Sequence, residues 1–159
     1  ALCELVNLHD DGLDFRPIHR VVFGVKPEEL LDELLSSCPS AVQGRAEGHV
    51  IPFVINRWSQ GEITITRPQV HLPVGTLQNF LDRFTAAHPR VRVDYIHGAD
   101  EARQLACERE DAIAFLLPPM AREELFPTVI HDGVLPRKTF SLGEAQDKRF
   151  YLEARKIRK

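Results

Sequence analysis

The densest group of residues that could bind an anion lies near the end of the chain, in residues 133–143. Arg137 and Lys138 stand directly before Thr139, Ser141 follows two residues later, and a glycine closes each end. A guanidinium can hold a phosphate or carboxylate through two parallel hydrogen bonds, Lys adds a point charge, and hydroxyls donate further hydrogen bonds. These residue types predict an anion site, and the alternative is a solvated turn beside a helix C-terminus.

Two segments that contain histidine are candidates to complete this site. His97 and Gly98 follow a predicted strand and precede a predicted helix, whose free N–H groups and positive dipole end attract anions. Gly98 would let a ligand approach the backbone closely. His19 and Arg20 are neighbours in another predicted strand, so their side chains point to opposite faces unless Pro17 introduces a bulge. The alternative for this pair is one buried, hydrogen-bonded side chain and one that faces solvent.

The sequence contains no motif typical of a metal site, a serine nucleophile or a nucleotide-binding glycine loop. The acids and histidines of His9-Asp10-Asp11 and His131-Asp132 lack the spacing of a zinc or two-metal site, so no metal is predicted. Ser141 is not part of a Gly-x-Ser-x-Gly motif, and the sequence has no Walker-type or Rossmann-type glycine pattern. The three cysteines are odd in number and widely spaced, which is typical of reduced structural thiols. No catalytic residue can be assigned.

The length and composition are those of one globular domain. The 159 residues are 43% hydrophobic and 27% charged, and no apolar run approaches the roughly 20 residues that a membrane helix needs. We therefore expect a single domain over residues 1–159, no membrane partner and a cytoplasmic location. Because the chain does not begin with Met, we expect it to be a piece of a longer protein.

The charge distribution argues against a nucleic-acid partner. The net charge is −3, and residues 134–159 carry eight Lys or Arg and three Asp or Glu, so the preceding residues carry −8. Proteins that bind nucleic acid broadly present a large basic face, which an acidic body does not offer. A single local phosphate contact is still compatible with this distribution.

Hydrophobic periodicity predicts the elements that must position these residues. Strands are predicted at residues 2–8, 15–23, 50–56, 62–67, 91–96, 112–117, 134–140 and 148–157. Helices are predicted to start near Pro27, Thr76, Ala99 and Met120, and residues 40–48 and 68–75 to form loops. The first two strands should form a hairpin. The order predicts an α+β fold, in which a mixed sheet carries helices and includes one short parallel βαβ unit at residues 91–117.

Several of these segments together resemble a family of bacterial and archaeal proteins called domain of unknown function 1015, which is partitioning-protein-like. The similar segments are Leu5-Val6-Asn7-Leu8 through Pro17-Ile18-His19-Arg20, Tyr95-Ile96-His97-Gly98, Ala112 to Pro119, and Leu135-Pro136-Arg137-Lys138-Thr139-Phe140-Ser141. The segment from Asp147 to Glu153 is similar to one subgroup. Ile18 stands where Thr is commoner in the family, and Arg137 where Gln is commoner.

The resemblance implies a partner that is absent from this chain, namely an N-terminal half related to the partitioning-protein and sulfiredoxin fold. Relatives of that fold include nucleotide-using free-serine kinases. The resemblance therefore implies that the full-length protein binds ATP, ADP or a small phosphorylated ligand and acts as a small-molecule phosphotransferase. No cofactor is predicted for the present chain alone. The implied ligand contacts are His19, Arg20, His97, Lys138 and Ser141, with Arg137 at the rim.

Two further functions stay open at this point. The domain could be a non-catalytic regulatory or assembly domain whose sheet-edge strands form a homodimer. A partition-type DNA-associated role is the third hypothesis, and the acidic body of the chain argues against it.

Overall fold

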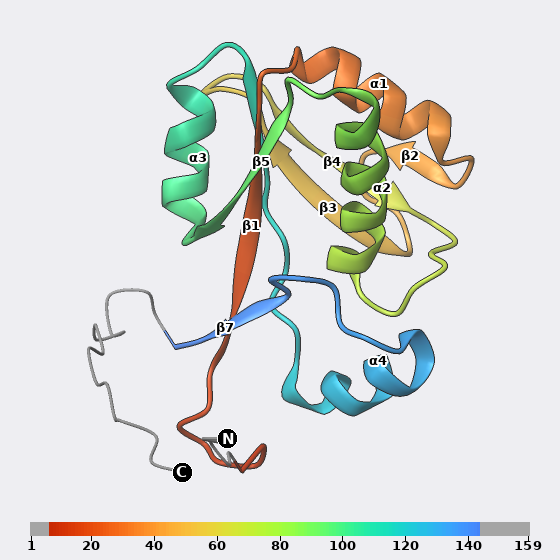
Figure 1. The fold of residues 1–159 in the computed structure, drawn as a ribbon, viewed down its shortest axis with the longest axis vertical. Helices are drawn as coiled ribbons and strands as arrows, with labels where there is room; N and C mark the ends of the chain where they lie inside the picture. The colour runs from red at the N-terminus through yellow and green to blue at the C-terminus, as the bar shows by residue number, and fades with distance from the viewer. Residues whose placement is uncertain (1–6, 144–159) are drawn as a thin grey trace, which may run out of the picture.

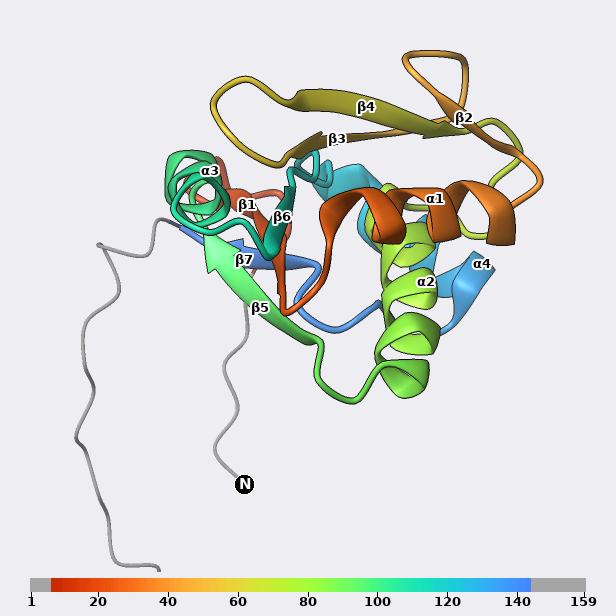
Figure 2. The ribbon, with the colours of Figure 1, turned by 90° about the horizontal axis from the view of Figure 1, so that it is seen from above.

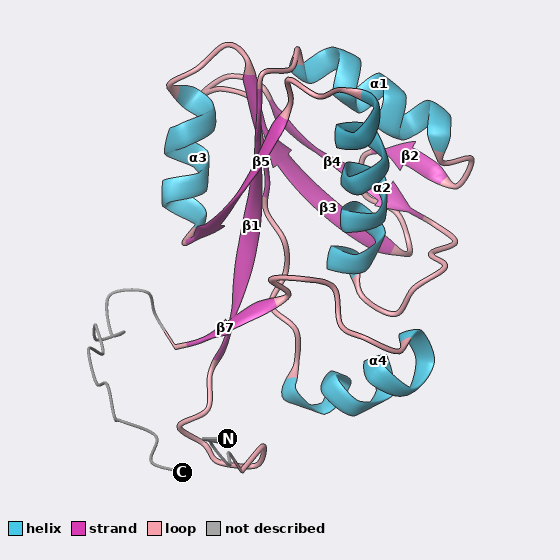
Figure 3. Cartoon of the chain, in the orientation of Figure 1, coloured by secondary structure: helices cyan, strands magenta, loops and turns pink. Residues whose placement is uncertain are grey.

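The computed structural model describes residues 7–143 and arranges them around one β-sheet with helices on both faces (Figures 1 and 3). The strands are β1 (Phe15–Phe23), β2 (Ala41–Gln43), β3 (His49–Val54), β4 (Gln60–Ile65), β5 (Arg92–His97), β6 (Ala112–Phe115) and β7 (Phe140–Leu142). The helices are α1 (Pro27–Ser37), α2 (Pro73–Ala87), α3 (Ala99–Cys107) and α4 (Leu125–Asp132), with a 3-10 turn, η1 (Arg122–Glu124), before α4. The predicted α+β class is confirmed.

The sheet is organised around β1, with the strand order β2-β4-β3-β6-β1-β5. Residues Arg20–Phe23 of β1 pair with β6, and residues Ile18–Phe23 pair with β5 on the other side. The start of β1 pairs with β7, where Pro17 faces Phe140. Pro17 thus lies before the part of β1 that has a strand on both sides, which is where a residue without an N–H is tolerated.

The predicted βαβ unit forms, but its two strands are not neighbours. β5 and β6 both run antiparallel to β1 and are therefore parallel to each other, with α3 as the connection. β1 lies between them, and each strand pairing in residues 7–143 is antiparallel. The expectation of a mixed sheet is corrected accordingly, whereas the predicted parallel direction of the two strands is confirmed. A βαβ pattern predicts the direction of two strands and carries no signal for a third strand inserted between them.

Smaller corrections concern boundaries. Residues 41–43, predicted as loop, form the short edge strand β2 against β4. Helix α2 starts at Pro73 rather than after Thr76, because proline is favoured in the first turn of a helix. Thr76 instead accepts or donates a hydrogen bond with the ring of His49. The strand predicted at residues 134–140 is wrong except at its last residue, because residues 137 and 138 form a turn and β7 begins at Phe140. Most of the predicted strand 2–8 and all of strand 148–157 lie outside the described residues.

Two apolar clusters hold the layers together, one on each face of the sheet (Figure 2). The larger cluster joins the sheet to α1 and α2 through residues such as Leu30, Leu77 and Phe115. The smaller one packs Ala102 and Ala106 of α3 against the opposite face. The alternation along β1 follows from strand geometry and sends Val22 to the first cluster and Val21 to the second. His19 and Arg20 are divided between the faces in the same way.

Candidate functional site

Arg20, a predicted ligand contact, is buried inside the fold and fastens the basic turn to the sheet. Its side chain is 0% exposed. Its guanidinium donates hydrogen bonds to the carbonyl oxygens of Arg137 at 2.8 Å and Lys138 at 2.9 Å, and Nε donates to Gln78 at 3.2 Å. A further bond goes to the carbonyl of Ile18. Burial lowers the pKa of Arg20 to about 10, which leaves it charged at neutral pH.

The rest of the turn is held by its own contacts. The Arg137 guanidinium forms an ion pair with Asp82 of α2 and, like Arg20, lies over the ring of Tyr95. The Thr139 hydroxyl donates to the carbonyl of Pro136 at 2.6 Å. Lys138 adopts a positive φ of 55°, and its side chain is exposed. The turn and α2 are therefore joined by an ion pair that an incoming anion would have to replace at Arg137.

His19 lies on the other face of the sheet, beside α3. Its Nδ1 accepts a hydrogen bond from the backbone N–H of Leu117 at 3.1 Å, so the neutral ring carries its proton on Nε2. Burial lowers the pKa of His19, and the charges of Arg20 and Arg103 lower it further. His19 and Arg20 thus do not face one site, as strand alternation predicts.

The start of α3, where an anion is expected beside Gly98, already holds a carboxylate. Gly98 has φ +88°, and a Cβ there would collide with the carboxylate of Glu101. The protein's own anion therefore occupies this helix N-terminus. His97 is opposite Ile18 in the sheet, and Ser141 is buried in β7 opposite Arg16. The structure brings Arg20, Arg137 and Lys138 together and keeps His19 and Gly98 apart from them.

We expect the free energy of unfolding to fall as the pH drops from 7 towards 5. Burial lowers the pKa values of His19 and His49 in the folded state. In the unfolded chain the histidine pKa is about 6.5, so below that pH the unfolded state binds more protons than the folded state. The loss begins near that pH and is complete once the pH is below both folded values. Urea denaturation should show a shallower decline in His19→Asn and His49→Asn. The exposed control His9→Asn should keep the wild-type slope, and equal slopes in all four proteins would contradict this account.

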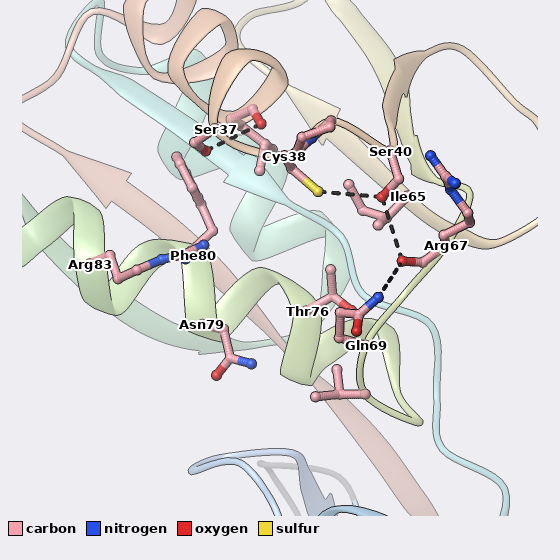
Figure 4. A pocket seen from close by; sticks show the side chains of 13 residues that line it. Ser37, Cys38, Ser40, Ile65, Arg67, Gln69, Thr76, Asn79, Phe80 and Arg83 are labelled. Carbon is pink, nitrogen blue, oxygen red and sulfur yellow. Dashed lines mark hydrogen bonds between the residues drawn. The ribbon is translucent and has the colours of Figure 1, made fainter.

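A separate hollow lies between the end of α1, the end of β4 and one face of α2. It has a volume of about 460 Å³, within the range typical of small-molecule pockets. Its lining comprises Leu34, Ser37, Cys38, Pro39, Ser40, Ile65, Arg67, Gln69, Val70, Thr76, Asn79, Phe80 and Arg83. Figure 4 shows Arg83 and Arg67 on opposite sides of the hollow, with Cys38, Ser40 and Thr76 between them. We call it the arginine cavity.

The arginine cavity combines an apolar floor with two cations. Leu34, Ile65 and Phe80 are each at most 5% exposed and form the floor. Within residues 7–143, neither the Arg67 nor the Arg83 guanidinium makes an ion pair or a hydrogen bond, and no Asp or Glu lines the cavity. Unpaired arginines at a cavity whose lining has no acidic residue favour a bound anion.

A larger and more open hollow, of about 1160 Å³, has the opposite character. It lies between the start of α1 and the end of α2, and its charged lining is mostly acidic, with Glu28, Glu29, Glu33, Glu110 and Asp111. An anion would be repelled there. The charge of the lining, rather than the size of the hollow, identifies the arginine cavity as the candidate site.

Sequence reasoning missed the arginine cavity, although part of its signal was present. Thr76, Asn79, Phe80 and Arg83 recur at i, i+3, i+4 and i+7, so they share one face of α2. The apolar members of α2 alone predict only the face that packs on the sheet. Arg67 follows β4, and nothing in the sequence indicates that the end of β4 lies opposite this face of α2.

Comparisons with known proteins found no family model, no curated protein and no solved structure that matches this chain. The resemblance to the family described above therefore stays a prediction. Within residues 7–143, no three side chains of His, Cys, Asp or Glu are grouped to hold a metal ion. None of the helices described is both long and apolar enough to cross a membrane.

Proposed function

We propose that the arginine cavity binds a small phosphorylated ligand, with a mononucleotide such as ADP as the representative case. The observation that carries this proposal is that Arg67 and Arg83 both line the cavity and that neither has an acidic partner in the described residues. A guanidinium binds a phosphate dianion through two parallel hydrogen bonds, so each arginine can hold one phosphate group on its own side of the cavity. The hydroxyls of Ser40 and Thr76 lie between the arginines, where Ser40 donates to the carbonyl of Arg67 and Thr76 is hydrogen-bonded to His49.

The remainder of the lining suits the body of such a ligand. Leu34, Ile65 and Phe80 offer apolar surface that can cover the non-polar part of a ligand. The amides of Asn79 and Gln69 can both donate and accept hydrogen bonds, as recognition of a heterocycle requires. This combination favours a nucleotide or similar phosphorylated metabolite over inorganic phosphate alone.

The chemistry of the lining favours binding over phosphoryl transfer. No carboxylate or imidazole lines the cavity in the described part of the chain, and such groups are the usual general bases and metal ligands of phosphoryl transfer. We therefore favour a regulatory ligand-binding domain of a cytoplasmic protein. In a longer protein of the resembled family, an N-terminal half would supply any catalytic groups. The free thiols of Cys38 and Cys107 are compatible with a reducing compartment.

A thermal-shift screen tests this proposal. We expect AMP, ADP or ATP at about 100-fold its dissociation constant to raise the melting temperature by roughly 5–10 °C. The rise should disappear in Arg67→Ala/Arg83→Ala and persist in the matched control Arg57→Ala/Arg90→Ala, which removes two exposed arginines outside the cavity. Without ligand, the two double variants should melt close to the wild type. No shift with any nucleotide, or an equal shift in both double variants, would contradict the proposal.

A further inference from the structure

The edge of the sheet formed by β5 has no neighbouring strand among the described residues. β5 pairs with β1 on one side and ends the strand order on the other. In Figures 1 and 2 no described helix or strand lies beyond it. An uncovered edge presents unpaired N–H and C=O groups that can accept another strand. The opposite edge strand, β2, has three residues, whereas β5 has six.

The side chains of β5 are arranged so that they can match a second copy of the same strand. Arg92 and Asp94 are exposed and, being two residues apart, share one face. Val93 and Tyr95 are half-buried and share the other face. One face therefore carries two opposite charges, and the other carries apolar surface.

We propose that two copies of this chain pair through β5, antiparallel and about a two-fold axis at Val93. In this register, Arg92 of each copy faces Asp94 of the other, which places two opposite-charge pairs on one face. Val93 faces its own copy, and Val91, the residue before β5, faces Tyr95, so the apolar side chains meet on the other face. Cross-strand pairs of both kinds stabilise antiparallel strands. The two sheets then form one continuous sheet across the dimer.

The neighbouring registers are disfavoured by charge. In a two-fold antiparallel pair, residues that lie opposite each other point to the same face of the sheet. The two-fold axis can therefore pass through any one residue of the strand, and the neighbouring registers place it one residue earlier or later. An axis at Arg92 would place two arginines opposite each other, and an axis at Asp94 would do the same with two aspartates. Like charges directly opposite each other destabilise a strand pair. The alternation of sign therefore favours the register at Val93 over these two neighbours, and of the three it alone forms opposite-charge pairs between Arg92 and Asp94.

The charges also distinguish this edge from one that is protected against association. Sheet edges are commonly guarded by charges of one sign, which repel a second copy. Here the two charges have opposite signs and are spaced so that they become complementary in a two-fold pairing. This proposal is independent of the ligand proposed for the arginine cavity, because none of the β5 residues lines that cavity.

Sedimentation equilibrium of the 159-residue chain, from about 1 µM to about 1 mM, tests the pairing. We expect the wild type to associate reversibly to a dimer. Asp94→Arg and Arg92→Asp, each alone, should weaken the dimer at least about tenfold, because like charges then face each other. An equimolar mixture of the two variants should associate again, since one copy then presents an arginine at both positions and the other presents an aspartate at both.

The double variant Arg92→Asp/Asp94→Arg keeps the complementarity and should dimerise like the wild type. Circular dichroism should show that all the variants are folded. A wild type that is monomeric throughout the range would overturn the proposal, as would a dimer unaffected by either single substitution or single variants that fail to associate when mixed.

Discussion

Arg20→Met is expected to lower the free energy of unfolding by about 3 kcal/mol. The guanidinium is fully buried and donates to Gln78 and to the carbonyls of Ile18, Arg137 and Lys138. Methionine fills much of the volume but has no donor, so three carbonyls lose their partner. Hydrogen bonds from a charged donor are worth about 1.5–3 kcal/mol each, partly offset because the burial cost of the charge also disappears.

Urea denaturation measures this loss, and hydrogen exchange localises it. The amides of residues 135–141 should exchange faster in Arg20→Met, because Arg20 is what ties their backbone to the sheet. Arg20→Lys should recover only part of the stability, since a single ammonium group cannot reach all the acceptors that the planar guanidinium contacts. The exposed control Arg57→Met should stay within about 0.5 kcal/mol of the wild type. A similarly small effect of Arg20→Met would show that the buried guanidinium does not hold the turn.

Phe115→Ala is expected to cost about 3–5 kcal/mol, the range for removing a buried phenylalanine side chain from a core. Phe115 is 0% exposed in β6, with Arg20 opposite on one side and Phe53 opposite on the other. Alanine would leave a cavity at the centre of the larger apolar cluster and beside the aliphatic part of Arg20. The cost therefore includes a loss of support for the buried guanidinium.

A double-mutant cycle separates the two contributions. Because Phe115 and Arg20 are directly opposite, the double variant Arg20→Met/Phe115→Ala should lose less stability than the sum of the single losses, by about 0.5 kcal/mol or more. The control is Leu105→Ala in α3, on the other face of the sheet, whose effect should add to that of Arg20→Met. Additive losses for Arg20 and Phe115 would mean that the ring does not support the guanidinium.

Much of the fold could be predicted from the sequence, and the failures have identifiable causes. Alternation and helical periodicity predicted the α+β class, the hairpin of β3 and β4, and the helix between β5 and β6. The insertion of β1 between β5 and β6 was missed because strand order depends on contacts between distant residues. Three-residue β2 is too short for periodicity to reveal, and its pairing with β4 makes it a strand.

The candidate site was less predictable from the sequence. Composition shows which residues are cations but not which acceptors their side chains bind in the folded protein. The basic turn at Arg137 and Lys138 is dense in hydrogen-bond donors. Its backbone carbonyls, however, accept hydrogen bonds from Arg20, and the Arg137 guanidinium forms an ion pair with Asp82. Arg67 and Arg83 are isolated in the sequence and become a pair only through the packing of β4, α1 and α2. That the residues singled out in the sequence contact a ligand stays a prediction. These residues are His19, Arg20, His97, Gly98, Arg137, Lys138, Thr139 and Ser141.

Isothermal titration of ADP tests the central claim most directly, because it can tell the arginine cavity from the basic turn. We predict one site per chain, with Arg67→Ala and Arg83→Ala each weakening binding at least about tenfold, as expected for a lost charged hydrogen bond. Lys138→Ala, in the basic turn, should bind like the wild type. Loss of binding in Lys138→Ala with full binding in both arginine variants would contradict the account, as would the absence of binding in the wild type.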